Sequence, residues 1–127
     1  MSTPANAGAS LVRKSFDSPD EIRTPRKTKV EVVDLGGVTA MRGTFEPGWK
    51  WSECMKPVAG TESCQVAHTG YVASGRMAIR MDDGAEVEYG PGDVGVIPPG
   101  HEAWVVGDDA CVFIDFQGGE TYAKPQE

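Results

Sequence analysis

The chain has 127 residues, 39% of them hydrophobic and 24% charged, which suits one globular domain and leaves no room for a second. Its 12 basic and 19 acidic residues give a formal net charge of −7, and an acidic body argues against nucleic acid as a partner. No apolar run approaches the about 20 residues of a membrane helix, and residues 1–15 show no signal-peptide core. Because the three cysteines are an odd number without close motif spacing, we expect a cytoplasmic protein without a disulfide framework.

The N-terminal residues differ in character from the rest of the chain. Residues 1–10 are small and polar, so residues 1–22 are predicted to form a flexible arm. Within this arm Ser18 can cap a helix whose first position is Pro19, and residues 16–23 therefore favour one short helical turn. Residues 23–127 remain for a single folded domain.

Short β-branched and alternating segments, separated by Gly, Pro and Asp, follow from Lys29 onward. The turn signals are Gly36-Gly37, Pro47-Gly48, Asp82-Asp83-Gly84, residues 90–93, Pro98-Pro99-Gly100 and residues 107–109. Between them lie predicted strands at residues 29–35, 38–45, 49–55, 64–74, 77–81, 85–89, 94–97, 103–106 and 111–116, with 56–63 as a loop. Such a pattern predicts an all-β domain of about ten strands, folded as a sandwich or closed barrel with almost no helix.

The two histidines of the chain, His68 and His101, are the first candidates for chemistry. Strand periodicity directs Cys64 and His68 to the same face, but on a straight strand they lie about 13 Å apart and cannot share an ion. We therefore expect His68 and His101 to come from neighbouring strands and to face one cavity. The remaining candidate ligands of a metal ion are Cys54, Glu53, Glu62 and, if the strand bends sharply, Cys64.

Aromatic residues supply a candidate pocket. Trp49 and Trp51 have the same strand parity and can form one aromatic wall, which either fills the barrel or lines a ligand pocket. Trp104 and Tyr71 are the other aromatic candidates for this pocket, and Tyr71 has the character to orient a carboxylate or carbonyl.

The stretch from His68 to Trp104 resembles the central part of a cupin. The second cupin motif runs glycine, five residues, Pro-x-Gly, two residues, histidine. Gly92 and, five residues later, Pro98-Pro99-Gly100 reproduce its opening. The motif histidine position falls on Ala103, and His101 stands two residues earlier.

The first cupin motif is also represented, in altered form. It runs glycine, five residues, His-x-His, three or four residues, Glu, six residues, glycine. Gly75 follows seven positions after His68, so His68 stands where the family has Glu. The His-x-His pair falls either on Cys54 and Lys56 or on Glu62 and Cys64. With two histidines in the chain, the family's usual site of three histidines and one glutamate cannot form.

The resemblance, over about residues 37–117, implies a double-stranded β-helix, the cupin or jelly-roll barrel, with a site for a small molecule inside. It implies an enzyme that uses His68 and His101, either with one divalent transition metal (Zn, Fe, Mn or Ni) as an oxygenase, isomerase or cyclase, or without metal through histidine general-base catalysis. The alternative is a non-catalytic barrel that binds or senses a small ligand.

We also expect a homodimer, because small cupins often pair. Residues 29–34, with alternating Val30 and Val32, are the predicted strand for addition to a partner's sheet edge.

Overall fold

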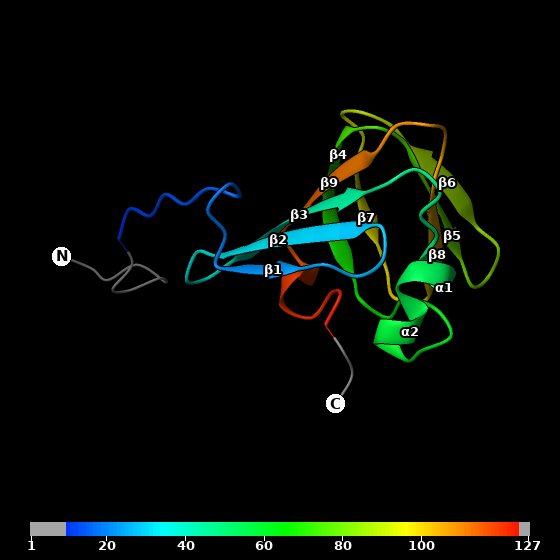
Figure 1. Ribbon diagram of the computed structural model, residues 1–127, viewed down its shortest axis with the longest axis horizontal. Helices are drawn as coiled ribbons and strands as arrows, with labels where there is room; N and C mark the ends of the chain where they lie inside the picture. Colours follow the sequence, from blue (N-terminus) through cyan, green and yellow to red (C-terminus); the bar gives the residue numbers. More distant parts are fainter. Residues whose placement is uncertain (1–9, 125–127) are drawn as a thin grey trace.

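The computed structural model describes residues 10–124, which form two antiparallel sheets facing each other across a common core (Figure 1). The six-stranded sheet has the order β1-β2-β3-β9-β4-β7, and the three-stranded sheet has the order β6-β5-β8. The strands are β1 (Glu21–Arg23), β2 (Thr28–Asp34), β3 (Thr39–Phe45), β4 (His68–Ser74), β5 (Met77–Met81), β6 (Glu86–Tyr89), β7 (Val94–Ile97), β8 (His101–Val105) and β9 (Cys111–Asp115). This architecture confirms the predicted all-β cupin barrel.

Turn chemistry places the strands largely where the sequence predicts them. Asp82-Asp83-Gly84 joins β5 to β6 as an antiparallel hairpin, and Gly84 adopts a φ of 97° that favours glycine. Gly100 adopts a φ of 92° directly before β8. This left-handed residue ends the Pro98-Pro99-Gly100 turn, and β8 begins at once with His101.

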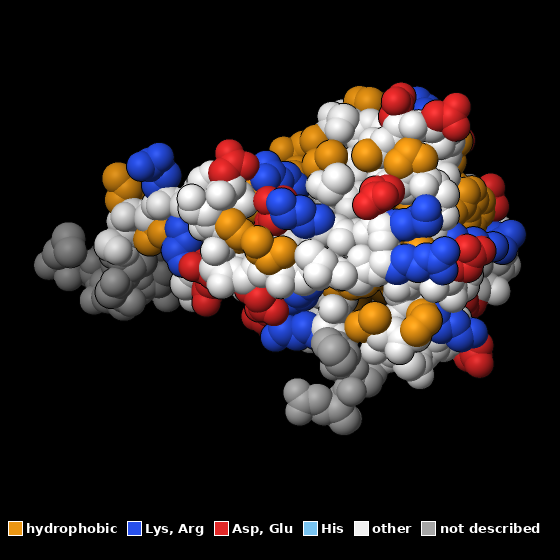
Figure 2. Space-filling model, in the orientation of Figure 1, with side chains coloured by type: hydrophobic (Ala, Val, Ile, Leu, Met, Phe, Trp, Pro, Cys, Tyr) orange, Lys and Arg blue, Asp and Glu red, His pale blue; other side chains and the backbone are white. Residues whose placement is uncertain are grey.

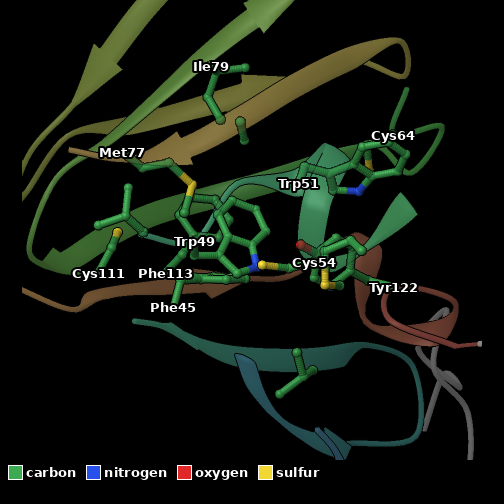
Figure 3. Packing of buried hydrophobic residues seen from close by; sticks show 14 of the residues in the cluster. Phe45, Trp49, Trp51, Cys54, Cys64, Met77, Ile79, Cys111, Phe113 and Tyr122 are labelled. Carbon is green, nitrogen blue, oxygen red and sulfur yellow. The ribbon is translucent and has the colours of Figure 1, made fainter. Parts of the chain in front are cut away.

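The core lies between the inner faces of the two sheets, where alternate residues of each strand are buried (Figure 3). In β8 the buried positions are His101, Ala103 and Val105, and in β4 they include His68 and Val72. Full burial of a large apolar side chain contributes about 1.5–3 kcal/mol. The strand parity that fills the core therefore also directs both histidines inward.

Residues 49–55, predicted as a strand, are mostly helical. Lys50 alone forms a single bridge, to Trp104, and the chain then enters α1 (Trp51–Cys54) and α2 (Lys56–Ala59). Trp51, Cys54 and Met55 are buried, a spacing of three and four residues that a helix places on one side. The prediction was wrong because this short segment satisfies both the strand and the helix period. A third short helix, η1 (Gly118–Glu120), follows β9.

The N-terminal part also departs from the sequence prediction. Residues 1–9 of the predicted arm lie outside the described residues. Residues 16–23 do not form the predicted helical turn, because Glu21–Arg23 pair with β2 as strand β1. Since β2 has β1 on one side and β3 on the other, residues 29–34 cannot add to a partner's sheet edge, and that prediction was wrong.

The surface carries charges of both signs, interspersed on the face shown in Figure 2, where no histidine side chain is visible. Both histidines are at least 95% buried, with exposures of 5% for His68 and 3% for His101. Among residues 10–124, no helix is long and apolar enough to cross a bilayer.

Candidate metal centre

Three potential metal ligands meet at one end of the barrel. His68 is the first residue of β4, His101 is the first residue of β8, and Cys64 forms an isolated bridge with His101. The bridge is closed by hydrogen bonds from the Cys64 N–H to the His101 carbonyl (2.8 Å) and from the His101 N–H to the Cys64 carbonyl (3.3 Å). One ligand atom from each of the three side chains lies within 4.8 Å of the others, and all three residues are buried.

The two histidine side chains lie next to each other as the sequence predicts, edge to face, with ring centroids 5.4 Å apart. The position of Cys64 differs from the straight-strand expectation, because its Sγ lies only 3.9 Å from Nε2 of His68. Residues 65–67 form no strand, and β4 begins only at His68. The chain bends between the two residues, and the separation of about 13 Å expected for a straight strand does not apply.

Asp115, the last residue of β9, fixes the orientation of His68. Its Oδ2 lies 2.5 Å from Nδ1 of His68, and its Oδ1 accepts hydrogen bonds from the backbone N–H groups of Thr69, Gln117 and Gly118. Complete burial opposes ionisation of this carboxyl, but the hydrogen bond with His68 and the backbone donors lower its pKa overall. An ionised Asp115 accepts a hydrogen bond from the Nδ1–H of His68, which leaves the lone pair of His68 Nε2 directed toward Cys64.

The orientation of His101 is fixed by a backbone carbonyl. Its Nδ1 lies 2.8 Å from the carbonyl oxygen of Pro98, and since a carbonyl only accepts, Nδ1 carries the proton. Burial, reinforced by the nearby His68, lowers the pKa of His101 to about 4. His101 is therefore neutral at pH 7, with the lone pair of Nε2 available to a ligand.

The Cys64 thiol is held in its neutral form in the absence of an ion. Burial is the main cause that raises its pKa, to about 11, although the indole N–H of Trp51 acts in the opposite direction. A metal ion reverses this balance, because it binds the thiolate and displaces the proton.

An apolar cavity adjoins the two histidines. It has a volume of about 30 Å³, which is room for about two water molecules. Its lining consists of Met41, Phe45, Trp51, His68, Val72, Met77, Ile79, Tyr89, Ile97, His101, Ala103, Phe113 and Tyr122.

Three of the predicted ligands do not join the cluster. Glu53 is exposed on α1, and Glu62 is exposed and paired with Lys56 at 2.7 Å. Cys54 is buried in the core, but its sulfur is not among the three ligand atoms that lie close together. Of the predicted metal ligands, the structure brings together His68, His101 and Cys64.

The predicted aromatic residues separate into inner and outer positions. Trp51 lines the cavity, whereas Trp49 does not and instead packs on Phe45, with ring centroids 4.6 Å apart. Trp104 points outward because it alternates with the buried positions of β8, and the Arg80 guanidinium lies 5.4 Å above its ring. Tyr71 is 38% exposed on β4. The single aromatic wall expected from strand parity is absent because the chain enters α1 at Trp51, so Trp49 and Trp51 do not share a strand.

Sequence reasoning missed two residues next to the site, Asp115 and Tyr122. Asp115 carried a usable signal, since an acid inside the apolar run of β9 is seldom buried without a partner. Tyr122 lies with its ring centroid 5.0 Å from that of His68, and nothing in its local sequence indicates this. Gly118 permits the close approach of this C-terminal segment, because a Cβ there would lie 2.7 Å from Asp115 Oδ2 and 2.8 Å from His68 Nδ1.

The residues of the cluster fit a transition-metal ion. Two imidazoles oriented by a carboxylate and a carbonyl, with one thiol, reproduce the ligand types and the supporting hydrogen bonds of known sites. Ligand atoms at about 2.0–2.3 Å from one tetrahedral ion lie about 3.3–3.7 Å apart, whereas the three atoms here lie within 4.8 Å of one another. An inward movement of side chains by about 1 Å would complete the site.

Comparisons with known proteins identify solved structures of the same fold and the family of the chain. No protein of curated function matches the chain in sequence. Among solved structures, the oxalate decarboxylase of Lactobacillus farciminis, in a formate complex, superposes with a TM-score of 0.55 at 19% identity, covering 79% of this chain and 32% of its own. The Clostridium difficile EutQ protein superposes with a TM-score of 0.52 at 16% identity, covering 76% of this chain and 65% of its own.

A Rhizobium leguminosarum protein of unknown function gives a TM-score of 0.56 at 20% identity, covering 85% of this chain and 98% of its own. At such identities the likeness shows the fold. The chain spans about a third of the length of the oxalate decarboxylase and about two thirds of EutQ. The sequence model of the EutQ-like cupin domain matches residues 45–111, more than half of the chain, and the chain belongs to this cupin family.

Proposed function

We propose that this protein is a metal-dependent enzyme that acts on a small molecule and holds one transition-metal ion through Cys64, His68 and His101. The observation that carries the proposal is the convergence of three buried ligand atoms within 4.8 Å of one another, with the two histidines in the lining of the inner cavity. The hydrogen bonds of Asp115 and Pro98 support it, because they leave Nε2 of each histidine free. Such supporting bonds accompany nearly all metal-binding histidines.

The ligand types favour Zn, Fe or Ni. A thiolate with two imidazoles suits these metals, whereas Mn²⁺ prefers carboxylates and water. No carboxylate belongs to the cluster found among residues 10–124. Manganese centres are named for the oxalate decarboxylase of Bacillus subtilis, which is 24% identical over 29% of its length. We therefore expect this protein to differ from that relative in its metal.

Three protein ligands leave a coordination position for a reactant, as catalytic zinc sites do. When bound, the ion would polarise a carbonyl group or activate water or oxygen. His68 and His101 bind and orient the ion, Asp115 holds the imidazole of His68 in the required tautomer, and the apolar lining excludes bulk water. His101 is a poor general base for catalysis without metal, because burial lowers its pKa to about 4.

A non-catalytic barrel that binds a small ligand is the second candidate. The apolar lining of the cavity favours it, since apart from the two histidines the lining residues carry no group that is charged at neutral pH. A ligand-binding barrel does not require an ion, so the metal content of the protein distinguishes the two functions.

The test is the elemental content of protein purified without a polyhistidine tag, from cells supplied with Zn, Fe, Ni and Mn. We expect about one Zn, Fe or Ni ion per chain, as in single-ion sites, and its loss in Cys64→Ser and His101→Ala. Cys111→Ala is the matched control, because Cys111 is buried in β9 outside the cluster. Metal-free protein that also takes up none of these ions on dialysis would overturn the proposal and leave the ligand-binding barrel.

A further inference from the structure

Two cavities, of very different size, meet at the candidate metal centre. The inner one, of about 30 Å³, contains the two histidines. The outer one is a groove of about 240 Å³, with the helices α1 and α2 on one side and residues 121–124 on the other. Trp51 and Tyr122 line both cavities, and Cys64 lies in the wall of the groove. Figure 3 shows these three residues at the same end of the core.

Tyr122 is the part of this boundary that can be displaced. Its side chain is 5% exposed and packs against His68, at 5.0 Å, and against Phe45, at 6.4 Å, between ring centroids. It belongs to no strand, and follows the short helix η1. Ala123, the next residue, adopts a φ of 66°, which costs of order 1 kcal/mol for a residue other than glycine.

Two side chains, Arg23 and Asp115, secure residues 118–124 to the barrel. Asp115 accepts a hydrogen bond from the Gly118 N–H (3.2 Å). Arg23, buried at the end of β1, donates hydrogen bonds to the carbonyl oxygens of Tyr122 (2.5 Å) and Glu120 (3.4 Å). The segment is therefore held over the histidines by a few polar contacts, and by the aromatic ring of Tyr122.

We infer that Tyr122 sets the upper size limit of the molecules that reach the metal centre. In place, its ring leaves a cavity with room for about two water molecules beside the histidines, which restricts ligands of the ion to molecules of about that size. Removal of the ring joins this cavity to the groove, whose walls are apolar at Met55, Val58, Ala59 and Val66. The enlarged site suits molecules with a metal-binding head, such as a carboxylate, and a flat apolar body. The inference rests on the proposed function.

The test uses full-length protein loaded with Co²⁺, whose visible absorption reports its ligands, titrated with formate and with benzoate. For the wild type we expect formate to change the spectrum and benzoate to bind weakly. Tyr122→Ala should raise the apparent affinity for benzoate about tenfold or more, because apolar cavities bind flat apolar molecules. The apparent affinity for formate should change less than about threefold. Tyr71→Ala, which removes an exposed tyrosine, is the matched control. Tyr122→Leu replaces Tyr122→Ala if the alanine variant does not fold.

A second measurement does not depend on metal. The alkylation rate of Cys64 by iodoacetamide in the metal-free protein, followed by peptide mass mapping, should rise about tenfold or more in the Tyr122 variant, because exposure controls thiol reactivity. Cys111 in the same sample reports global opening, and its rate should not change.

The outcomes distinguish a failure of the proposed metal site from a failure of the size limit set by Tyr122. Wild-type protein without a cobalt spectrum contradicts the proposed function, and in that case the Cys64 alkylation rate decides the role of Tyr122. A normal cobalt spectrum with unchanged benzoate affinity in both Tyr122 variants overturns the size limit and leaves the proposed function in place. Unchanged alkylation of Cys64 in both variants overturns the size limit as well.

Discussion

Single hydrogen bonds determine which nitrogen of each histidine is available at the centre. His68 and His101 use Nδ1 to bond Asp115 and the Pro98 carbonyl, respectively, and both leave Nε2 free. The sequence indicated the two histidines and Cys64, but not these partners. Hydrogen-bond partners far apart in the chain, such as residues 68 and 115, depend on strand pairing and cannot be obtained from local pattern.

The role of Asp115 can be tested with Asp115→Asn. The amide has the same shape, but when its oxygen keeps the backbone donors its NH₂ group faces His68, which must then carry its proton on Nε2. We expect metal affinity to fall about 10–100-fold, measured by competition with a chelating dye. Asp108→Asn, in an exposed turn, is the control. Wild-type affinity in Asp115→Asn would show that Asp115 does not orient the histidine.

At the scale of the elements, close contact between β4 and β9 brings His68 to Asp115. Gly70 lies on β4 opposite Asp115, and a Cβ at this position would lie 1.7 Å from the Ile114 carbonyl oxygen. We expect Gly70→Ala to lower the free energy of unfolding by about 3 kcal/mol or more, because backbone must shift to accommodate the methyl group.

Urea unfolding measures this difference. The control is Gly37→Ala, where a Cβ meets no atom within 4 Å and the expected change is within about 0.5 kcal/mol. Equal stabilities of the two variants would contradict the close packing of β4 on β9.

A partly buried ion pair joins β2 to β3 on the outer face of the six-stranded sheet. Glu31 is 5% exposed and accepts hydrogen bonds from Arg42 at 2.8 and 2.9 Å. The hydrogen bond from Arg42 is the main cause that lowers the pKa of Glu31 below its ordinary value of 4.5. Since the pKa is lowered in the folded state, the stabilisation is complete above the ordinary value and is lost as the pH falls through the lowered one.

We therefore expect Glu31→Gln to destabilise the protein at pH 7 by about 1–3 kcal/mol, with the difference from the wild type shrinking toward low pH. Glu88→Gln is the control, because Glu88 and its partner Arg76 are both largely exposed and such pairs contribute about 0–1 kcal/mol. Urea unfolding between pH 7 and pH 3 measures both variants. If the stability difference between Glu31→Gln and the wild type grows as the pH falls, the ionised Glu31 does not stabilise the fold through Arg42.

Element positions show where sequence patterns are sufficient and where they fail. Asp82-Asp83-Gly84 predicts its hairpin because the turn depends on residues adjacent in the chain. The segment Trp49–Met55 fits a strand or a helix equally well, and contact with the core decides for the helix. Cys64 joins His68 because Cys64 bridges to His101, a long-range contact that bends the chain where the sequence predicts a straight strand.

For the whole molecule, the predicted homodimer stays a prediction, and the structure changes its expected interface. The exposed edges of the six-stranded sheet are β1 and β7, and β7 carries Val94 and Val96, which are 75% and 65% exposed. An edge strand with exposed apolar side chains favours pairing with another chain. We propose antiparallel pairing of β7 with β7 of a second copy.

Sedimentation velocity tests this interface. A Val94→Lys, Val96→Lys double variant should be monomeric at a concentration where the wild type is dimeric, because it places like charges opposite one another across the two-fold axis. Val38→Lys between β2 and β3, where Val38 is 47% exposed, is the control and should stay dimeric. A monomeric wild type, or a dimeric double variant, would contradict the proposal.

The central claim, that Cys64, His68 and His101 hold one ion, is tested most directly by X-ray absorption at the metal edge of the metal-loaded protein. We expect one sulfur at about 2.3 Å and two imidazole nitrogens at about 2.0–2.1 Å, with the sulfur absent from Cys64→Ser. A coordination shell of oxygen and nitrogen alone in the wild type, or a sulfur that persists in Cys64→Ser, would contradict it.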